Sequence, residues 1–174
     1  MALKLFFFIS LILSLLFYYS PIESSVSGNE KENRPIFIFE NPVMYTLNEM
    51  GVSKKIISTQ AVRYKNKDEI YFANIEIFNK DSKKNYYKDS LKAEFIEKKG
   101  EKYYLANSVK FKRDNFIEFN TDELYFDNIK KIARNKAHFN AFYYENFYSG
   151  TNLYFDINKN YIKSRRTQFI IEKN

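Results

Sequence analysis

The tetrapeptide Leu124-Tyr125-Phe126-Asp127 recurs, letter for letter, as Leu153-Tyr154-Phe155-Asp156. A weaker similarity pairs Phe72-Ala73-Asn74 with Leu105-Ala106-Asn107. Recurrence at a spacing of about thirty residues is typical of stacked copies of one supersecondary unit, and tyrosine and phenylalanine favour strands. The unit is therefore predicted to be a β-hairpin or β-arch, which suits a scaffold or groove better than an active site. Chance recurrence is the alternative in a chain with 15 tyrosines and 18 phenylalanines.

Strand-like segments follow one another at short spacing along most of the chain, and turn signals such as Asn66-Lys67-Asp68 and Asn158-Lys159-Asn160 separate them. No proline follows Pro42, which permits uninterrupted β-ladders. This regular succession of strands and turns predicts an all-β sandwich, roll or barrel, with a short helix at Tyr45–Met50 as the one local alternative. The predicted strands are Ile36–Phe39, Val43–Leu47, Lys55–Tyr64, Glu69–Phe78, Tyr87–Glu97, Lys102–Lys112, Phe116–Thr121, Glu123–Asp127, Ile129–Ala133, Ala137–Tyr144, Phe147–Asp156 and Tyr161–Glu172.

Alternation is clearest in Lys102–Lys112. One face carries Tyr103, Leu105, Val109 and Phe111, and the other carries lysines. In Ala137–Tyr144 both faces carry aromatic side chains. A strand that is apolar on both faces either lies between two sheets or lines an apolar cavity, and these two possibilities stay open here.

The residue types that usually carry catalysis are scarce. The chain has no cysteine and a single histidine, His138, so thiol chemistry is excluded and no metal-binding histidine spacing exists. His138 is predicted to be a strand surface residue. Asp127 and Asp156 recur at the ends of predicted strands, where an Asx-turn is a better interpretation than a metal site. We therefore expect no enzyme activity, no cofactor and no metal.

The first twenty residues differ from the rest of the chain. Leu5–Tyr19 is a run of about fifteen residues without a charge, short but feasible for a spanning helix. Tyr18 and Tyr19 suit the membrane interface, and Lys4 favours a cytoplasmic N-terminus. We expect a transmembrane anchor at 1–20, a flexible tether at 21–34 and one exported β-domain at 35–174. A cleaved signal peptide, with Ser25-Val26-Ser27 near its cleavage site, is the alternative.

The order of several segments resembles the LptC family, the membrane-anchored subunit of lipopolysaccharide export in Gram-negative bacteria. After the apolar N-terminus, the segments that carry the resemblance are Tyr45–Gly51, Ile57–Tyr64, Leu91–Phe95, Tyr104–Phe111, Phe119–Asp127 and Gly150–Asp156. The resemblance implies an open, V-shaped antiparallel β-jelly roll of the OstA/LptA type with an apolar interior. It also implies a single-pass inner-membrane protein whose C-terminal domain lies in the periplasm.

The same resemblance implies the ligand and the partners. The ligand is lipopolysaccharide or lipo-oligosaccharide, accepted from an ATP-driven extractor whose permease subunits carry periplasmic β-jelly-roll domains, and passed to a soluble LptA-like bridge protein. Lysine and arginine at the rim would meet lipid phosphates. The expected lipid-groove residues are Ile75, Ile77, Leu105, Val109, Phe111, Ile117, Phe119, Leu124, Phe126, Phe139, Leu153 and Phe155. The expected partner-edge residues are Ile36, Phe37, Ile38 and Phe39 toward the permease, and Gly150, Thr167, Phe169 and Ile171 toward the bridge protein.

Aspartate in place of Ile75, Leu105 or Phe119 is expected to block lipid loading without unfolding the domain. A glycine such as Gly150 is also consistent with an ordinary hairpin turn. The main alternative function is a secreted structural or adhesive β-protein with a cleaved signal peptide, followed by an exported hydrolase. Nucleic acid is not an expected partner, because the aromatic residues alternate into a core instead of clustering with arginine.

Overall fold

A computed structural model describes residues 34–80 and 85–171. By its internal contacts the chain divides into residues 1–31 and a second unit, 32–174, to which all of the described residues belong. The predicted anchor, nearly all of the predicted tether, and the C-terminal residues 172–174 lie outside the described residues. None of the residues in the described ranges forms a helix long and apolar enough to cross a bilayer.

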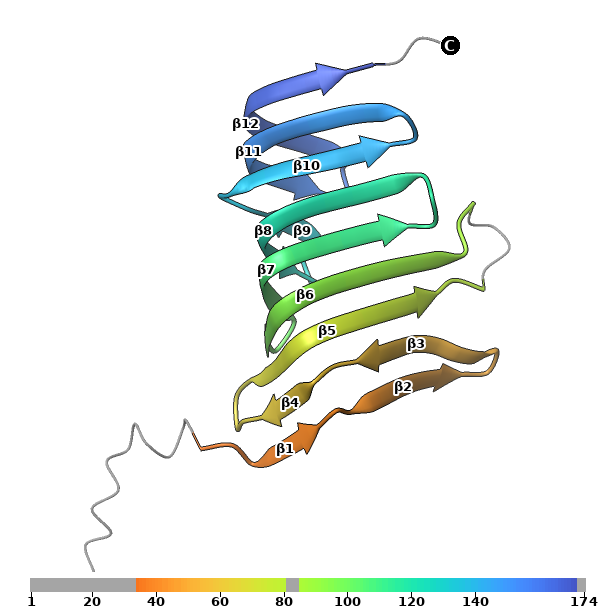
Figure 1. Cartoon of the computed structure of the whole chain (residues 1–174), viewed down its shortest axis with the longest axis vertical. Coiled ribbons are helices and arrows are strands. Elements are labelled where there is room, and N and C mark those ends of the chain that lie inside the picture. Colours follow the sequence, from red (N-terminus) through yellow and green to blue (C-terminus); the bar gives the residue numbers. More distant parts are fainter. Residues whose placement is uncertain (1–33, 81–84, 172–174) are drawn as a thin grey trace, which may run out of the picture. The chain divides into compact units, whose positions relative to one another are not determined.

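The described residues form one antiparallel sheet of twelve strands (Figure 1). The main order is β1-β4-β5-β6-β7-β8-β10-β11-β12, while β2 pairs with β3, β3 with β5, and β9 with both β8 and β11. The strands are β1 (Phe37–Glu40), β2 (Val43–Asn48), β3 (Gly51–Ile57), β4 (Gln60–Arg63), β5 (Asp68–Phe78), β6 (Lys88–Lys99), β7 (Lys102–Arg113), β8 (Ile117–Asp127), β9 (Ile132–Arg134), β10 (His138–Tyr143), β11 (Asn146–Asp156) and β12 (Tyr161–Ile170).

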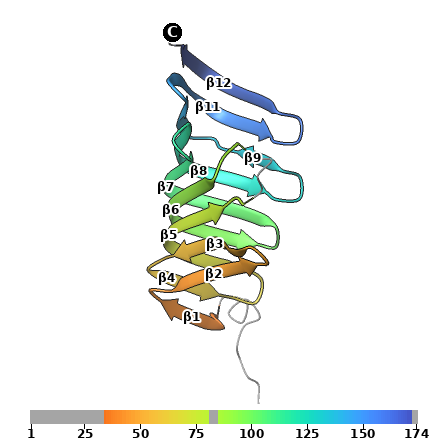
Figure 2. The same cartoon turned by 90° about the vertical axis from the view of Figure 1, so that its right-hand side faces the viewer.

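The sheet is bent along its length into two layers. Each long strand runs through both layers, so that β3 and β4 pair with different halves of β5, and β10 and β9 with different halves of β8. We call the layer that contains β2, β3 and β10 the first layer, and the layer that contains β1, β4 and β9 the second layer. The first layer faces the viewer in Figure 1, and Figure 2 shows the strands stacked from β1 to β12 in side view.

The bends lie at irregular positions within the strands. Left-handed backbone angles occur at Phe72 in β5, at Asn107 and Ser108 in β7, at Asn152 in β11 and at Arg166 in β12. The ladders between β6, β7 and β8 shift register at the same level. An extra residue of this kind bends a strand and increases its twist. The bends therefore turn one continuous sheet into two facing layers.

The core lies between the two layers. Ala73, Ala93, Ile96, Leu105 and Val109 form a buried cluster, and half-buried side chains from both layers pack against it. Alanine at two of these positions suits the bend, because small side chains let neighbouring backbones approach. Val109 and Phe139 are the most deeply buried side chains of the described part of the chain.

A buried polar network ties the strands together at the bend. Asn135, between β9 and β10, donates from Nδ2 to Thr121 Oγ1 at 2.7 Å and accepts from the Leu153 amide at 2.9 Å. The Asn135 amide in turn donates to the Leu153 carbonyl at 3.0 Å. Thr121 donates to the His138 carbonyl at 2.9 Å. Every polar atom of the Asn135 side chain thus contacts a partner, which a buried amide requires.

The all-β, antiparallel prediction is confirmed, with differences in where strands begin and end. The predicted strand at Lys55–Tyr64 is two strands, β3 and β4, because the chain passes between layers at Ser58 and Thr59. The predicted strands Phe116–Thr121 and Glu123–Asp127 are one strand, β8. The alternative of a helix at Tyr45–Met50 is wrong, since β2 continues to Asn48 before a turn.

The two exact repeats occupy equivalent positions. Tyr125 of β8 and Tyr154 of β11 both pair with Arg134, on opposite sides of β9. Asp127 Oδ1 accepts hydrogen bonds from the amides of residues 129 and 130, and Asp156 Oδ1 accepts one from residue 159. The Asx-turn interpretation is therefore confirmed. The weaker repeat is not equivalent, because Phe72 lies at a bend and is exposed, whereas Leu105 is buried.

Candidate functional site: the inner face of the sheet

The inner face of the sheet is lined by apolar side chains that lie side by side across the strands. In the first layer Ile75, Leu91, Phe111 and Phe119 are aligned across β5 to β8. In the second layer Ile70, Ile96, Leu105 and Leu124 are aligned across the same strands. Because aligned residues on neighbouring strands share a face, these rows form two apolar surfaces that face the core.

The structure brings the predicted groove residues together on this face. Their burial divides them into two groups. Leu105, Val109, Phe139 and Leu153 are buried and belong to the core. The others are half-buried or exposed and line the remainder of the inner face: Ile75, Ile77, Phe111, Ile117, Phe119, Leu124, Phe126 and Phe155.

Charged groups occupy the margin of the inner face, the row farthest from the bend. In the first layer Arg113 binds Asp89 through two nitrogen–oxygen contacts of 2.8 and 3.0 Å, and its guanidinium lies 3.9 Å from the centre of the Tyr86 ring. In the second layer Arg63 binds Asp68 in the same way. The hydrogen bond from Arg63 lowers the pKa of Asp68, against an opposing effect of burial. The apolar surface thus ends at ion pairs on each layer.

The predicted partner edges lie at the two ends of the strand order. Ile36 precedes β1 and donates its amide to the Arg63 carbonyl at 2.7 Å, and Phe37, Ile38 and Phe39 lie in β1 itself with about half of each side chain exposed. Thr167 and Phe169 lie in β12 at the other end, and Ile171 follows it with 76% of its surface exposed. Both end strands leave one edge unpaired in the part of the chain that the structure describes.

Gly150 is not at an edge and is not in a hairpin turn, so both interpretations require correction. It is buried in the middle of β11, one strand inside the C-terminal end, and is aligned with Phe139. A Cβ atom here would lie 3.0 Å from the Arg165 carbonyl oxygen and 3.2 Å from the Phe139 ring. The glycine is needed for close packing of β10, β11 and β12.

A family model described as "Lipopolysaccharide-assembly, LptC-related" matches residues 3–160. The chain belongs to this family. Among solved structures it is similar to LptH of Pseudomonas aeruginosa, the LptA-homologous periplasmic component of the conserved lipopolysaccharide transport device. That similarity has a TM-score of 0.34 and 9% identity over 82% of this chain and 99% of the other. A search of curated proteins finds no match.

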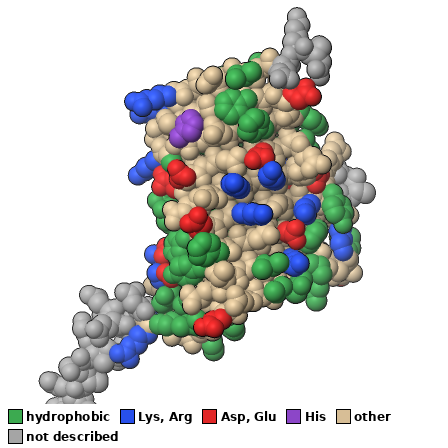
Figure 3. Space-filling view, viewed as in Figure 1, with side chains coloured by type: hydrophobic (Ala, Val, Ile, Leu, Met, Phe, Trp, Pro, Cys, Tyr) green, Lys and Arg blue, Asp and Glu red, His purple; other side chains and the backbone are tan. Residues whose placement is uncertain are grey.

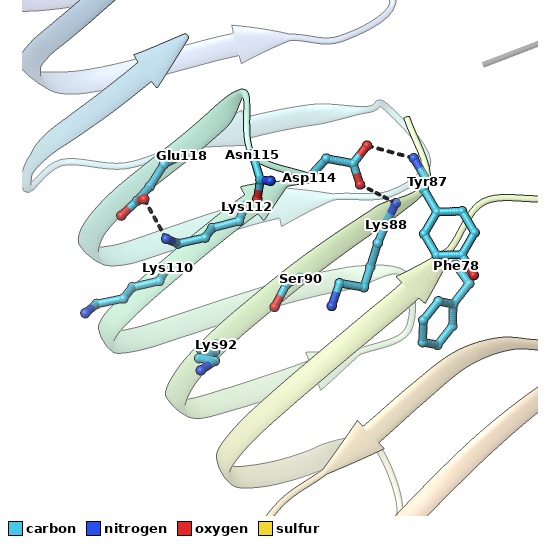
Figure 4. Close-up of a pocket in the computed structure, with 10 residues that line it drawn as sticks. All are labelled: Phe78, Tyr87, Lys88, Ser90, Lys92, Lys110, Lys112, Asp114, Asn115 and Glu118. Atoms are coloured by element: carbon cyan, nitrogen blue, oxygen red, sulfur yellow. Dashed lines mark hydrogen bonds and ion pairs between the residues drawn. The ribbon is translucent and has the colours of Figure 1, made fainter. Parts of the chain in front are cut away.

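Sequence reasoning missed one feature of this LptC-related chain, a basic depression on the outer face of the first layer. Figure 3 shows lysines gathered near the middle of that face. The depression has a volume of about 850 Å³. It is lined by Phe78, Tyr87, Lys88, Ser90, Lys92, Lys110, Lys112, Asp114, Asn115 and Glu118 (Figure 4). The signal was present in the sequence, because Lys88 and Lys92 alternate on one strand, as do Lys110 and Lys112 on the next.

His138 is an exposed residue of β10 whose Nε2 lies 3.1 Å from Asn140 Oδ1. The prediction that it is a strand surface residue is confirmed. Among the described residues no three acidic, histidine or cysteine side chains are placed to hold a metal ion.

Proposed function

We propose that this chain is a lipopolysaccharide-transport subunit whose inner face holds the acyl chains of the lipid between the two layers. Two findings support the proposal, the membership of the LptC-related family and the continuous apolar inner face. The apolar inner face is the finding on which the mechanism rests. Residues 1–20 anchor the chain in the inner membrane and the β-domain lies in the periplasm. The lipid arrives from an ATP-driven extractor and leaves to a soluble bridge protein of the same fold.

The energetic need for such a surface follows from the hydrophobic effect. Exposing one CH₂ group to water costs about 0.8 kcal/mol, so an acyl chain of about a dozen carbons costs on the order of 10 kcal/mol. A lipid with several such chains cannot cross an aqueous compartment unprotected. Transport also requires release, which suits a general apolar surface better than a tight specific pocket. No covalent step is needed at this surface.

Burial decides which inner-face residues contact the lipid in this proposal. Ile75, Phe111 and Phe119 are half-buried, so part of each side chain remains accessible. Leu105 is 3% exposed and packs in the core cluster. Aspartate at position 105 would bury a charge without a partner and destabilise the fold. We therefore expect Leu105→Asp to unfold the domain, while Ile75→Asp and Phe119→Asp are suitable tests of loading.

The decisive experiment uses three consecutive residues of β8. Leu124 and Phe126 point to the inner face, and Tyr125 between them points outward with 43% of its surface exposed. A photo-crosslinking amino acid is placed at each position of the full-length chain in cells that make lipopolysaccharide. We expect adducts with the lipid at positions 124 and 126 and none at 125. Adducts at 125 that equal those at its neighbours would contradict the groove.

The free edges of β1 and β12 are proposed to bind partners by β-augmentation, in which strands of neighbouring domains extend the sheet. The β1 end would meet the permease domain and the β12 end the bridge protein. Ile171→Asp places a charge beside the β12 edge and should reduce co-purification of the LptA-like bridge protein several-fold. Ile129→Asp, at an isoleucine that is 77% exposed in the turn after β8, is the control for the same added charge away from this edge. Unchanged co-purification of the Ile171 variant would remove this edge from the proposal.

A further inference from the structure

Two lysines on the outer face of the first layer lie directly opposite each other. Lys92 of β6 and Lys110 of β7 are aligned in the antiparallel ladder, and both side chains are exposed. Like charges in this arrangement repel each other and destabilise the sheet. Within the described residues neither lysine has an acidic group within 4.0 Å, the distance of an ion pair. The fold therefore holds two adjacent positive charges that an added anion would neutralise.

The other charges around the depression are already paired. Lys88 Nζ lies 3.2 Å from Glu76 and Lys112 Nζ lies 2.7 Å from Glu118. Hydrogen bonds from Lys112 and from Asn120, and to a smaller extent the charges of Lys112 and Lys110, lower the pKa of Glu118, and this carboxylate forms its ion pair with Lys112. Asp114 accepts hydrogen bonds from the amides of residues 87 and 88, both at 2.8 Å. Lys92 and Lys110 are left as the cations available to a ligand.

An aromatic pair closes the other end of the depression. The rings of Phe78 and Tyr87 meet edge to face with centroids 6.4 Å apart, and Tyr87 is largely exposed. Phe78 is aligned with Lys88, four residues before Lys92 on β6. At about 3.3 Å per residue this is a separation of roughly 13 Å along the strand. A ligand that contacts both ends must therefore be longer than a single sugar ring.

We propose that this depression binds a phosphorylated saccharide of at least two sugar rings, with a phosphate between Lys92 and Lys110 and a ring against Tyr87. A phosphomonoester dianion matches the two unpaired ammonium groups in charge, and lysine binds phosphate as a point charge. The aromatic rings offer an apolar surface to the C–H face of a sugar. The site lies on the opposite side of the sheet from the acyl-chain surface and does not depend on it.

The test is a calorimetric titration of the full-length chain in a non-ionic detergent. The probes are the monophosphate of trehalose, trehalose itself and inorganic phosphate. Saturable binding of the phosphorylated disaccharide is expected, with weaker binding of inorganic phosphate and none of trehalose. The double variant Lys92→Gln/Lys110→Gln should bind at least about tenfold more weakly, because each charge-assisted bond to phosphate contributes on the order of a factor of ten.

The control variant Lys102→Gln/Lys163→Gln removes the same net charge from exposed strand positions outside the depression. It should bind as the unaltered chain does. Equal loss in both variants, or wild-type binding by the Lys92/Lys110 variant, overturns the proposal. Tyr87→Ala should weaken the phosphorylated disaccharide but not inorganic phosphate, and equal effects on both would remove the sugar from the assignment.

A competition experiment identifies the source of the ligand. If added lipopolysaccharide displaces the trehalose phosphate, the site takes the phosphorylated headgroup of a lipid. If both bind together, the site takes a separate soluble phosphosaccharide. Either result supports the site. Failure of positions 124 and 126 to crosslink lipid would affect only the acyl-chain surface, so the two proposals fail independently.

Discussion

At the scale of single residues, the most constrained positions lie at the bend and in one charged cluster of the second layer. In that cluster Glu69 accepts hydrogen bonds from Lys67 at 2.5 Å and from Tyr71 at 2.8 Å. Burial alone would raise the pKa of Glu69, but these hydrogen bonds and the charge of Lys67 lower it on balance. Gly150 is constrained by space instead, because the Arg165 backbone and the Phe139 ring occupy the volume of a side chain.

Replacing Gly150 with alanine should therefore destabilise the domain by about 1–3 kcal/mol, the usual cost of overpacking a well-packed core. The measurement is the free energy of unfolding in urea. Gly100→Ala is the comparison, since Gly100 has no atom within 4 Å of a new Cβ and only its φ of 56° opposes the change. A Gly150→Ala variant as stable as the unaltered chain would contradict the packing argument.

Tyr71 gives a prediction about alkaline pH. The hydrogen bond to Glu69, and then burial, raise the pKa of Tyr71 from 10.0 to about 12. The neutral hydroxyl is favoured in the folded state, so its contribution is complete below pH 10 and is lost as the pH rises through about 12. Tyr71→Phe should cost about 1 kcal/mol at neutral pH, and the difference from the unaltered chain should shrink above pH 10 and vanish above about pH 12. Tyr45→Phe, an exposed position, should show no such convergence.

At the scale of elements, alternation in the sequence was sufficient to place most strands but not the bends. The pattern in β7 correctly assigned Tyr103, Leu105, Val109 and Phe111 to one face. The pattern gave no sign that Asn107 and Ser108, between Leu105 and Val109, adopt left-handed backbone angles. This irregularity in β7 depends on how the strand pairs with β6 and β8. Alternation identified the inner-face candidates within each segment, but across the bend of β8 the inward-facing positions change from odd to even numbers, as Phe119 and Leu124 show. Gly150 was misplaced, because its role depends on a ring from β10 and a carbonyl from β12.

β9, the shortest strand, lies between the two strands that carry the repeated tetrapeptide, so a substitution in β9 tests how much it stabilises them. β9 pairs with β8 on one side and with β11 on the other, so Ala133 lies in the middle of a ladder. Ala133→Pro removes an amide donor there and should lower the free energy of unfolding by about 3 kcal/mol or more. Ala133→Ser keeps the amide and should have a much smaller effect. Equal effects of proline and serine would mean that β9 contributes little to the sheet.

At the scale of the whole described domain, the continuity of the strands means that neither layer can unfold alone. Val109 is fully buried at the bend, and Val109→Ala should cost about 2 kcal/mol. The chain has no tryptophan, so single tryptophans at Phe142 in the first layer and at Tyr125 in the second report on each layer. We expect coincident urea transitions for both probes, shifted together by Val109→Ala without a change in slope. Separate midpoints would show that the layers are independent.

The position of the β-bulges has a consequence for how such a protein can change over time. Each bulge lies where a strand leaves one layer and enters the other. The bulge therefore makes the choice of inward-facing positions in one layer independent of the choice in the other. A one-residue insertion or deletion at that point reverses which side chains face inward in one layer and leaves the other layer unchanged. The inward-facing side chains of the two layers can thus change separately, in evolution or by design, within a single uninterrupted sheet.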